Sequence, residues 1–256
     1  MIAVFAAMDA EVQPLLKAAV LRESSEGSGF PVIRAEIGGR EAIVCRTGLG
    51  RRAAAAAEAV LGSFSPKVVL SAGTAGGLSP DLNAGDIVLC DRVRAADGAS
   101  PDDTEPVLAD PGLLAVALRA TKRAGVAVRF GRSVTVDTVA WGVEEKAQLR
   151  SQAGDDIVEM ESYWVGRVAQ RHGIPFLAVR AVSDGAEDTL IDIPGLVGED
   201  GVIDYSRFLP YVQQHPEHVP LLAHGAESSR RALASLEAFA AAFLPAALSL
   251  AGARPA

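Results

Sequence analysis

Short apolar runs alternate with helical patterns along most of this chain, and no other feature restricts its fold so strongly. The strand-like runs cover residues 2–7, 68–72, 85–93, 126–136 and 175–182. The helical patterns between them cover residues 10–20, 51–61, 111–124, 144–151 and 163–171. Runs that are apolar on both sides suit strands with two buried faces. The alternation therefore predicts a mostly parallel sheet covered by helices.

A hairpin signal makes this sheet mixed. Residues 31–37 and 41–46 have strand patterns on either side of Gly38-Gly39, a pair that favours a tight turn. A chain of 256 residues suits one large domain. We therefore predict a single three-layer α/β domain over residues 1–256, with a central mixed β-sheet flanked by helices.

The pattern changes at residues 185–225, where acids, glycines and prolines interrupt the regular runs. We expect a loop-rich excursion there, with one short helix at about 205–213. A C-terminal helix is expected at about 226–244, with Ser228 or Ser229 as its cap.

The charge balance points away from polyanionic partners. Lys and Arg number 24 against 32 Asp and Glu, which gives a formal net charge of −8. An extended nucleic-acid or anionic-membrane footprint is therefore not expected, and a small ligand in a pocket fits better. Uncharged runs stay shorter than the roughly 18 residues that span a membrane, so no integral span is expected.

Two features favour the cytoplasm. The N-terminus lacks the basic region of a signal peptide and becomes acidic at Asp9. Cys45 and Cys90 lie far apart inside apolar runs, without the spacing of a redox pair, which indicates buried free thiols. We expect a cytoplasmic protein.

Two acidic motifs end apolar, strand-like runs. Val158-Glu-Met-Glu161 comes first, and Arg180-Ala-Val-Ser-Asp184 places its aspartate 23 residues after Glu161. Ligands of α/β sheets bind beyond the carboxyl ends of the strands, so both carboxylates are expected at one rim. One could hold a hydroxylated ligand while the other moves a proton. Taken singly, Glu161 could instead begin a helix, Asp184 could be solvated, and Glu11 could be a favourable first-turn acid.

A glycine-rich turn follows the apolar run at 68–72. The stretch Ser71-Ala-Gly-Thr-Ala-Gly-Gly77 lets the backbone approach a ligand closely, because glycine has no side chain. A tight structural turn would have the same composition. The stretch lacks the spacing of the dinucleotide fingerprint and of the phosphate loop that ends in Gly-Lys-Ser/Thr, which disfavours a nucleotide cofactor.

Six motifs occur together in one order and carry a family resemblance. They are Ala6-Ala-Met-Asp-Ala-Glu11, Thr47-Gly-Leu-Gly50, Gly73-Thr-Ala-Gly-Gly-Leu78, Gly85-Asp-Ile-Val88, Val158-Glu-Met-Glu161 and Arg180-Ala-Val-Ser-Asp184. Over residues 1–188 the chain resembles the purine nucleoside phosphorylase superfamily, and within it the hydrolytic methylthioadenosine/S-adenosylhomocysteine nucleosidases. The resemblance implies a phosphorylase/hydrolase-like fold and release of adenine by hydrolysis of an N-glycosidic bond.

The resemblance also implies roles for three carboxylates. Asp184 matches the aspartate that donates a proton to purine N7, and Glu161 matches the glutamate that binds the ribose hydroxyls. Glu11 matches a residue that helps to activate the attacking water. These roles suit the chemistry, because cleavage develops positive charge on the ribose and negative charge on the base.

Further substrate-binding positions follow from the same motifs. The full set that we expect is Glu161, Met160, Glu159, Thr74, Ala75, Gly76, Ser183, Val139 and Arg180. Within it Met160 packs on the sugar, Thr74 lies near the water and Ser183 supports the catalytic aspartate. The expected substrate is a small purine nucleoside, and no metal or organic cofactor is expected. The resemblance further implies a homo-oligomer, specifically a homodimer, and a place in methionine salvage.

Water is favoured over phosphate as the nucleophile. Phosphorylases of the superfamily carry a phosphate loop with glycine and arginine after the first strand, and another arginine just before the glycine turn. This chain has the acidic stretch 8–11 and Ser71 at those places, and acidic residues repel phosphate. Arg46, Arg51 and Arg52 could still bind an anion, or could be solvated cations at a helix start.

Two departures leave the substrate open. The nucleosidases place an aromatic residue against adenine in the stretch before the Glu-Met-Glu strand, where this chain has residues 136–141 with Trp141 as the aromatic. The tail is also longer and resembles that of hopanoid-associated phosphorylase-like proteins, which are thought to remove adenine from an adenosyl-lipid. The alternatives are therefore an adenosylhopane nucleosidase or phosphorylase, a phosphate-dependent purine nucleoside phosphorylase, and a noncatalytic nucleoside-binding protein.

Overall fold

The computed structural model describes residues 1–27, 29–96 and 105–253. Its strands are β1 (Ile2–Ala6), β2 (Val20–Gly27), β3 (Phe30–Ile37), β4 (Arg40–Arg46), β5 (Val69–Gly77), β6 (Ile87–Ala95), β7 (Val107–Leu108), β8 (Arg129–Thr135), β9 (Ile157–Glu159) and β10 (Phe176–Asp184). Its α-helices are α1 (Asp9–Leu16), α2 (Arg52–Phe64), α3 (Pro111–Ala124), α4 (Val143–Ala153), α5 (Ser162–Arg171), α6 (Phe208–Gln214) and α7 (Val219–Ala253). Two 3-10 turns, η1 (Tyr205–Arg207) and η2 (Pro216–His218), flank α6.

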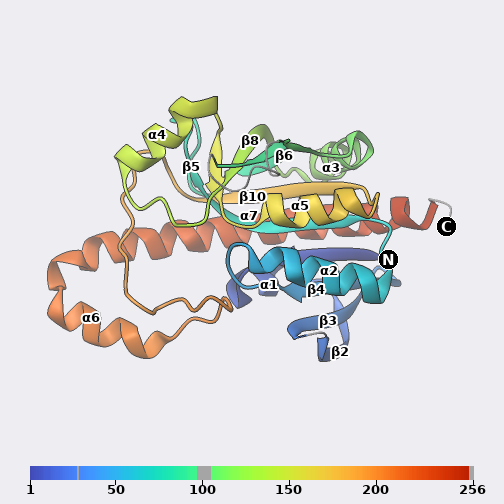
Figure 1. The fold of residues 1–256 in the computed structure, drawn as a ribbon, viewed down its shortest axis with the longest axis horizontal. Helices are drawn as coiled ribbons and strands as arrows, with labels where there is room; N and C mark the ends of the chain where they lie inside the picture. Colours follow the sequence, from blue (N-terminus) through green and yellow to red (C-terminus); the bar gives the residue numbers. More distant parts are fainter. Residues whose placement is uncertain (28, 97–104, 254–256) are drawn as a thin grey trace.

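The strands form one mixed sheet, part of which closes on itself (Figure 1). β10 pairs with β5 on one side and β6 on the other, and β8 and β9 lead from β6 back to β5. From β5 the sheet extends through β1 and β4 to the antiparallel strands β3 and β2. The predicted hairpin at Gly38-Gly39 is confirmed as the β3–β4 connection, and both glycines have positive φ, as a tight hairpin turn requires.

Alternate residues of β1 face two different cores. Ile2 and Val4 belong to the core that includes buried residues of α1, α3 and α7, whereas Ala3 and Phe5 belong to the core that includes buried residues of α2 and α5. All five residues of β1 are buried, so this strand has no solvent-facing side. The predicted class, a mixed sheet with helices on both faces, is confirmed.

The first helix is shorter than predicted, and an unpredicted strand follows it. α1 ends at Leu16, whereas the apolar pattern predicted a helix over 10–20. From Val20 the chain forms β2, which lies at the edge of the sheet and pairs with β3. The sequence of β2 is mostly polar because an edge strand buries little side-chain surface. It therefore lacks the apolar run by which most of the other strands were found, and the two-residue strand β7 was not predicted either.

The C-terminal helix needs the largest correction. α7 begins at Val219 and ends at Ala253, whereas we predicted 226–244, so the loop-rich excursion is correspondingly shorter. Ser228 is not a cap but a buried residue inside the helix. The apolar face of α7 continues past Pro245 to Ala251, and its burial outweighs the local cost of the proline.

By length and composition alone, this last helical region is long and apolar enough to cross a membrane. The span Pro216–Gly252 has a mean hydropathy of 1.7 in its most apolar window, of which 39% is buried. Figure 1 shows α7 running beside β10, and Leu236, Phe239 and Phe243 are completely buried there. A core helix passes the same test, so this is weak support for a membrane span.

Candidate active site

A cavity of about 670 Å³ opens beyond the carboxyl ends of β5 and β10. Its volume lies within the range of about 300–1,000 Å³ that is typical of small-molecule sites. Its lining includes most of the predicted site residues, namely Glu11, Thr74, Ala75, Gly76, Val139, Glu159, Met160, Glu161, Ser183 and Asp184. Arg180 is not part of the described lining, and it reaches the site through its contacts with Glu159 and Glu161.

Glu11 lies in the first turn of α1 and is buried. Its Oε2 accepts hydrogen bonds from the backbone N–H groups of Ala7 at 3.0 Å and Met8 at 3.2 Å. Its Oε1 accepts from the backbone N–H of Thr74 at 2.7 Å and from the hydroxyl of Thr74 at 2.9 Å. The carboxylate therefore closes the start of the helix and also faces the cavity. The interpretation of Glu11 as a first-turn acid is therefore confirmed, and the same carboxylate lies on the cavity.

Two glycines of β5 make room for carboxylates. A Cβ on Gly73 would lie 2.7 Å from Oε1 of Glu11, and a Cβ on Gly76 would lie 3.0 Å from Oδ2 of Asp184. A larger residue at either position would displace the acid beside it. The glycine-rich stretch 71–77, which the sequence analysis predicted as a turn after the strand, is instead the second part of β5, and its glycines leave room for the two carboxylates that lie against it.

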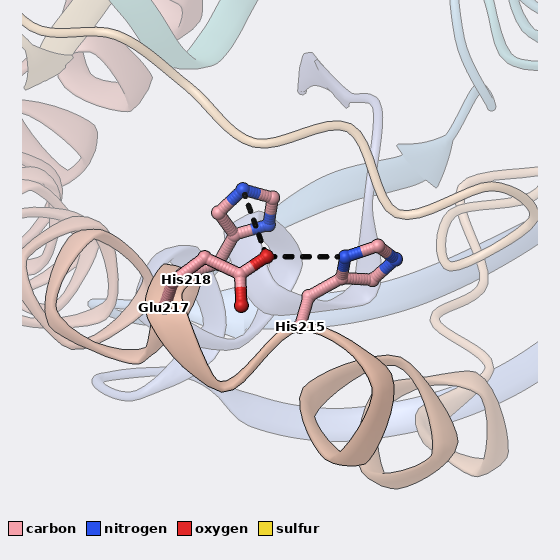
Figure 2. A group of neighbouring side chains, drawn as sticks. All are labelled: His215, Glu217 and His218. Atoms are coloured by element: carbon pink, nitrogen blue, oxygen red, sulfur yellow. Dashed lines mark hydrogen bonds and ion pairs between the residues drawn. The ribbon is translucent and has the colours of Figure 1, made fainter.

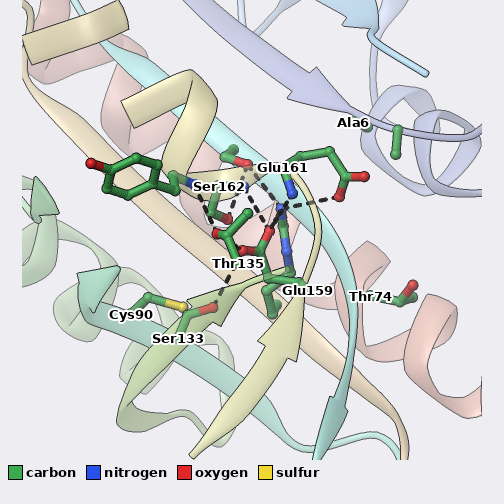
Figure 3. Close-up of polar contacts among 12 residues, drawn as sticks. Ala6, Thr74, Cys90, Ser133, Thr135, Glu159, Glu161 and Ser162 are labelled. Carbon is green, nitrogen blue, oxygen red and sulfur yellow. Dashed lines mark hydrogen bonds and ion pairs between the residues drawn. The ribbon is translucent and has the colours of Figure 1, made fainter. Parts of the chain in front are cut away.

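Glu159 connects Arg180 to Glu161 in a buried network, and Figure 3 shows Glu159 with Thr135, Glu161 and Ser162. Its Oε2 accepts hydrogen bonds from Arg180 Nη2 at 2.7 Å and from the backbone N–H groups of Glu161 at 2.9 Å and Ser162 at 2.6 Å. Its Oε1 accepts from the hydroxyl of Thr135. Glu159 therefore satisfies the first N–H groups of α5 and fixes the backbone from which Glu161 projects.

The two glutamates of this network carry different charges near neutral pH. Burial raises the pKa of Glu161 to about 8, and the negative charge of Glu159 adds to the shift, against the opposing charge of Arg180. Burial also disfavours the ionised form of Glu159, but the Arg180 charge and the Thr135 hydroxyl outweigh it and lower the pKa of Glu159. The network thus holds an ionised Glu159 beside a largely protonated Glu161.

Replacing Glu161 with Gln should make the protein more stable in alkaline solution. The unfolded Glu161 ionises near its ordinary pKa of 4.5, whereas the folded residue keeps its proton up to about pH 8. The folded state therefore binds more protons between these values. The free energy of unfolding of the wild type falls as the pH rises through this window, and the full penalty is present above about pH 8. Urea unfolding at about pH 5, 7 and 9 should show that the free energy of unfolding of E161Q increasingly exceeds that of the wild type as the pH rises.

The glutamine keeps the size of the side chain and an oxygen that can accept the N–H of Gly50, which lies 2.9 Å from Glu161 Oε1. Glu187→Gln, in an exposed loop, is the control and should follow the wild type at each pH. A wild type and an E161Q variant with the same pH dependence would show that Glu161 titrates like a surface carboxylate.

Asp184 ends β10 with a donor on each carboxylate oxygen. The hydroxyl of Ser183 donates to Oδ1 at 2.7 Å, and the ammonium of Lys146 donates to Oδ2 at 2.6 Å. Lys146 comes from α4, is 1% exposed and is the single buried residue of that helix. The sequence analysis missed it, because nothing in the α4 pattern distinguishes a lysine that faces the core from one that faces solvent.

Trp141 lies on the cavity lining together with Val139. Its backbone N–H donates to Glu145 Oε2 at 2.7 Å, at the start of α4. Its backbone carbonyl accepts from the N–H of Leu190 at 2.8 Å. These two bonds hold the Trp141 segment between α4 and the excursion.

Much of the remaining lining is apolar and comes from late in the chain. It includes Leu190, Ile191, Ile193, Leu196, Val197, Leu221, Leu222 and Leu233. The leucines at 221 and 222 belong to the part of α7 that the sequence analysis had assigned to the loop-rich excursion. The early start of α7 therefore determines the character of this side of the cavity.

Two of the three arginines near the start of α2 have acidic partners, whereas the guanidinium of Arg52 lies over the ring of Phe30. Arg46 pairs with Asp9 at 3.0 Å and donates to the backbone carbonyl of Asp200 at 2.6 Å. Arg51 pairs with Asp137 at 3.0 Å. Neither guanidinium belongs to the described lining of the cavity. These contacts disfavour the anion site that the sequence left open.

Away from the cavity, one group among the described residues could offer three ligands to a metal ion, namely His215, Glu217 and His218 (Figure 2). Oε1 of Glu217 lies 3.3 Å from His215 Nδ1 and 4.0 Å from His218 Nε2. The hydroxyl of Tyr211 contacts His218 Nδ1 at 2.9 Å. Figure 2 shows one dashed contact from the Glu217 carboxylate to each of the two imidazoles. This geometry is that of a hydrogen-bonded turn.

The fold and the cavity define an α/β protein with a carboxylate-lined pocket at the carboxyl ends of parallel strands, where such proteins bind small ligands. The sequence model of the family described as Phosphorylase superfamily matches residues 1–200 of the chain. The chain therefore belongs to the phosphorylase superfamily, as its six motifs indicated.

Several curated relatives of the chain are nucleosidases. The 5'-methylthioadenosine/S-adenosylhomocysteine nucleosidase of Glaesserella parasuis is 27% identical over 232 residues, which cover 86% of this chain and 96% of the relative. The enzyme of the same name from Actinobacillus succinogenes is 30% identical over 224 residues, which cover 82% and 91%.

Solved structures confirm the fold. The 5'-methylthioadenosine/S-adenosylhomocysteine nucleosidase of Neisseria meningitidis, in complex with methylthio-immucillin-A, has a TM-score of 0.75 and 23% identity, covering 95% of this chain and 97% of that chain. The futalosine hydrolase of Helicobacter pylori has a TM-score of 0.72 and 20% identity, covering 93% and 96%.

Proposed function

We propose that this protein is a nucleosidase that hydrolyses the N-glycosidic bond of an adenine nucleoside and releases adenine. The observation that carries the proposal is the meeting of three buried carboxylates, Glu11, Glu161 and Asp184, on one cavity. They come from three distant segments of the chain, and each has its own hydrogen-bonding support. Methylthioadenosine and S-adenosylhomocysteine are the first-choice substrates, because the curated relatives are named for them.

Asp184 is the proposed general acid, and Glu11 is the group proposed to activate water. The bond between ribose C1′ and adenine N9 breaks, and its electron pair goes to the base. Asp184, which takes up a proton from solvent before the bond breaks, gives that proton to N7, so adenine leaves as a neutral molecule. Water bonds to C1′ through its oxygen and releases a proton to Glu11, beside the hydroxyl of Thr74. Each transfer reduces charge that would otherwise develop on a reactant.

Glu161 is proposed to bind the ribose hydroxyls, with Met160 packed on the sugar. Both side chains line the cavity. Because the pKa of Glu161 is about 8, its carboxyl group can both donate and accept hydrogen bonds with a diol near neutral pH. Arg180 and Glu159 are proposed to hold Glu161 in place through their contacts with each other and with the Glu161 backbone.

Water is the proposed nucleophile rather than phosphate. The carboxylate of Glu11 faces the cavity and repels a second anion. The nearby Arg46 is already paired with Asp9, and a phosphate ion would need a free cation there. An acidic pocket wall with a neutralised arginine suits an uncharged nucleophile.

Adenine release from methylthioadenosine, measured with and without phosphate, tests the proposal. We expect equal rates in both buffers and free methylthioribose as the second product. A requirement for phosphate, with a sugar phosphate as product, would overturn the hydrolytic assignment. Binding without base release from any adenosyl substrate would support the noncatalytic nucleoside-binding protein instead.

A second candidate substrate carries a long apolar group at the 5′ carbon, as an adenosyl-lipid such as adenosylhopane does. The apolar lining from the excursion and from Leu221, Leu222 and Leu233 favours it. The same assay with 5′-alkylthioadenosines of increasing chain length separates the two candidates. Burial of each added methylene is worth about 0.8 kcal/mol, or about fourfold in kcat/KM. A rise of that size would support the lipid, and a fall would support methylthioadenosine.

We also propose a cytoplasmic homodimer that acts in methionine salvage. Both cysteines are free and buried, which suits a reducing compartment. Light scattering of the purified protein measures its assembly.

A further inference from the structure

We propose that Lys146 is a positioning residue for Asp184, and that its ammonium stabilises the aspartate as its proton passes to the leaving base. This inference rests on the proposed function, because it concerns the acid of that reaction. Lys146 is not among the described residues that line the cavity, so it would act on the substrate only through Asp184.

All three N–H donors of the Lys146 ammonium have acceptors in or next to the turn that follows Asp184. Its Nζ lies 2.6 Å from Asp184 Oδ2, 2.7 Å from the backbone carbonyl of Gly185 and 2.9 Å from the backbone carbonyl of Asp188. An ammonium has three N–H donors, and these three acceptors match them. A buried cation is costly unless it is paired in this way. The pairing therefore fixes Lys146 and Asp184 relative to each other.

The contacts of Lys146 with the carbonyls of Gly185 and Asp188 also stabilise the turn that follows β10. The backbone N–H of Gly185 donates to Asp188 Oδ2 at 2.7 Å, and Asp188 Oδ1 lies 3.4 Å from His224 Nε2 of α7. Asp188 and His224 both line the cavity. Lys146 thus joins α4 to the end of β10 and, through this turn, to the cavity wall.

Ser183 gives Asp184 a way to hold a proton while Lys146 stays in place. The Ser183 hydroxyl has one proton and two acceptors, Asp184 Oδ1 at 2.7 Å and the Ala75 carbonyl at 3.2 Å. It donates to Oδ1 when the carboxylate is ionised and can turn to Ala75 when Oδ1 is protonated. Oδ1 is therefore the oxygen that gains and gives the proton, and Oδ2 remains bound to Lys146.

The effect of Lys146 is largest as the proton leaves. At that moment Asp184 gains a negative charge in a nearly water-free place, where a charge without a partner is costly. A fixed ammonium at hydrogen-bonding distance offsets this charge without rearrangement. A leaving group that departs without a proton gains nothing from this arrangement.

Lys146→Met tests the inference with two leaving groups. Methionine keeps an unbranched stem and removes the ammonium. Adenine release from methylthioadenosine should fall by about 10² to 10³, the usual loss when one preorganised donor is removed. Cleavage of a 4-nitrophenyl methylthioriboside, whose nitrophenolate leaves unprotonated, should fall much less. Equal losses on both substrates, or no loss on either, would overturn the inference.

If the nitrophenyl substrate is not cleaved, a double variant tests whether Lys146 acts through Asp184. In the Asp184→Asn background, Lys146→Met should cause no further loss of adenine release, because Lys146 acts through Asp184. A further loss equal to that in the wild-type background would show an independent role. Lys17→Met is the matched control, since Lys17 forms an exposed ion pair with Glu237, and it should leave turnover unchanged.

Two measurements distinguish a failure of the Lys146 inference from a failure of the proposed function and from a variant that does not fold. A wild type that releases no adenine from any adenosyl substrate refutes the proposed function, whereas an active wild type with an equally active K146M refutes only the inference. Should K146M not fold, Lys146→Ala assayed with methylammonium replaces it. Recovery of adenine release with methylammonium but not with tetramethylammonium supports the role, and folded protein without recovery contradicts it.

Discussion

Asp184→Asn should remove most adenine release while leaving the fold in place. The amide has the shape of the carboxylic acid but no proton that it can give to a purine. General acid catalysis is worth about 10² to 10⁴ in rate, so we expect kcat for methylthioadenosine to fall by at least about 10². KM should change little, because Asp184 acts mainly on the leaving base in the transition state. Steady-state adenine release measures both constants.

This substitution also leaves the Lys146 ammonium without its counter-charge. Removal of one partner of a buried ion pair typically costs about 3–5 kcal/mol, so the thermal midpoint should fall, and the assay belongs well below it. Asp91→Asn, exposed on β6, is the control and should keep wild-type turnover. Retained turnover in D184N would remove Asp184 from the proposed role.

Glu11→Gln should lower kcat about as much as Asp184→Asn, for a different reason. The amide cannot take a proton from water, and loss of a general base typically lowers the rate by about 10² to 10⁴. Stability should fall too, because the carboxylate accepts four hydrogen bonds, from Ala7, Met8 and twice from Thr74. The NH₂ of a glutamine would have to face at least one backbone N–H donor, which costs about 1–3 kcal/mol. Adenine release and urea unfolding of one preparation separate the two effects.

Asp9→Asn is the matched control for Glu11. Asp9 lies in the same first turn of α1 but is exposed, and its side chain pairs with Arg46. The variant should hydrolyse methylthioadenosine at the wild-type rate in buffer without phosphate. If Glu11→Gln kept more than about a tenth of the wild-type kcat, Glu11 would have only its structural role at the helix start.

The strands that the sequence predicted most clearly begin with buried apolar runs. β1, residues 69–70 of β5 and residues 176–179 of β10 are apolar and buried because helices cover them on both faces. β2 escaped prediction because an edge strand has no such constraint. The true start of α7 escaped it because Pro216, Pro220 and Gly225 resemble loop residues, although the helix runs through the latter two once its apolar face is packed.

The candidate site divides in a similar way. Glu11, Glu161 and Asp184 were found because each ends or follows a strand in a motif of fixed order, and β5 and β10 place their ends together. Lys146 gave no such signal, since its contact with Asp184 joins residues 38 positions apart. Glu159 was predicted to bind substrate, and its contacts show that it supports the backbone of Glu161 and the charge of Arg180.

The sequence by itself determined the alternation of strands and helices, the order of the six motifs, and thereby the family and the three carboxylates on one rim. Only the tertiary structure decided what those carboxylates are chemically. Burial and Glu159 keep Glu161 protonated to about pH 8, Lys146 provides the charge beside Asp184, and α7 makes part of the cavity apolar. The physical reason is that strand and helix patterns are local, whereas charge state and pocket character depend on neighbours that only the folded chain brings together.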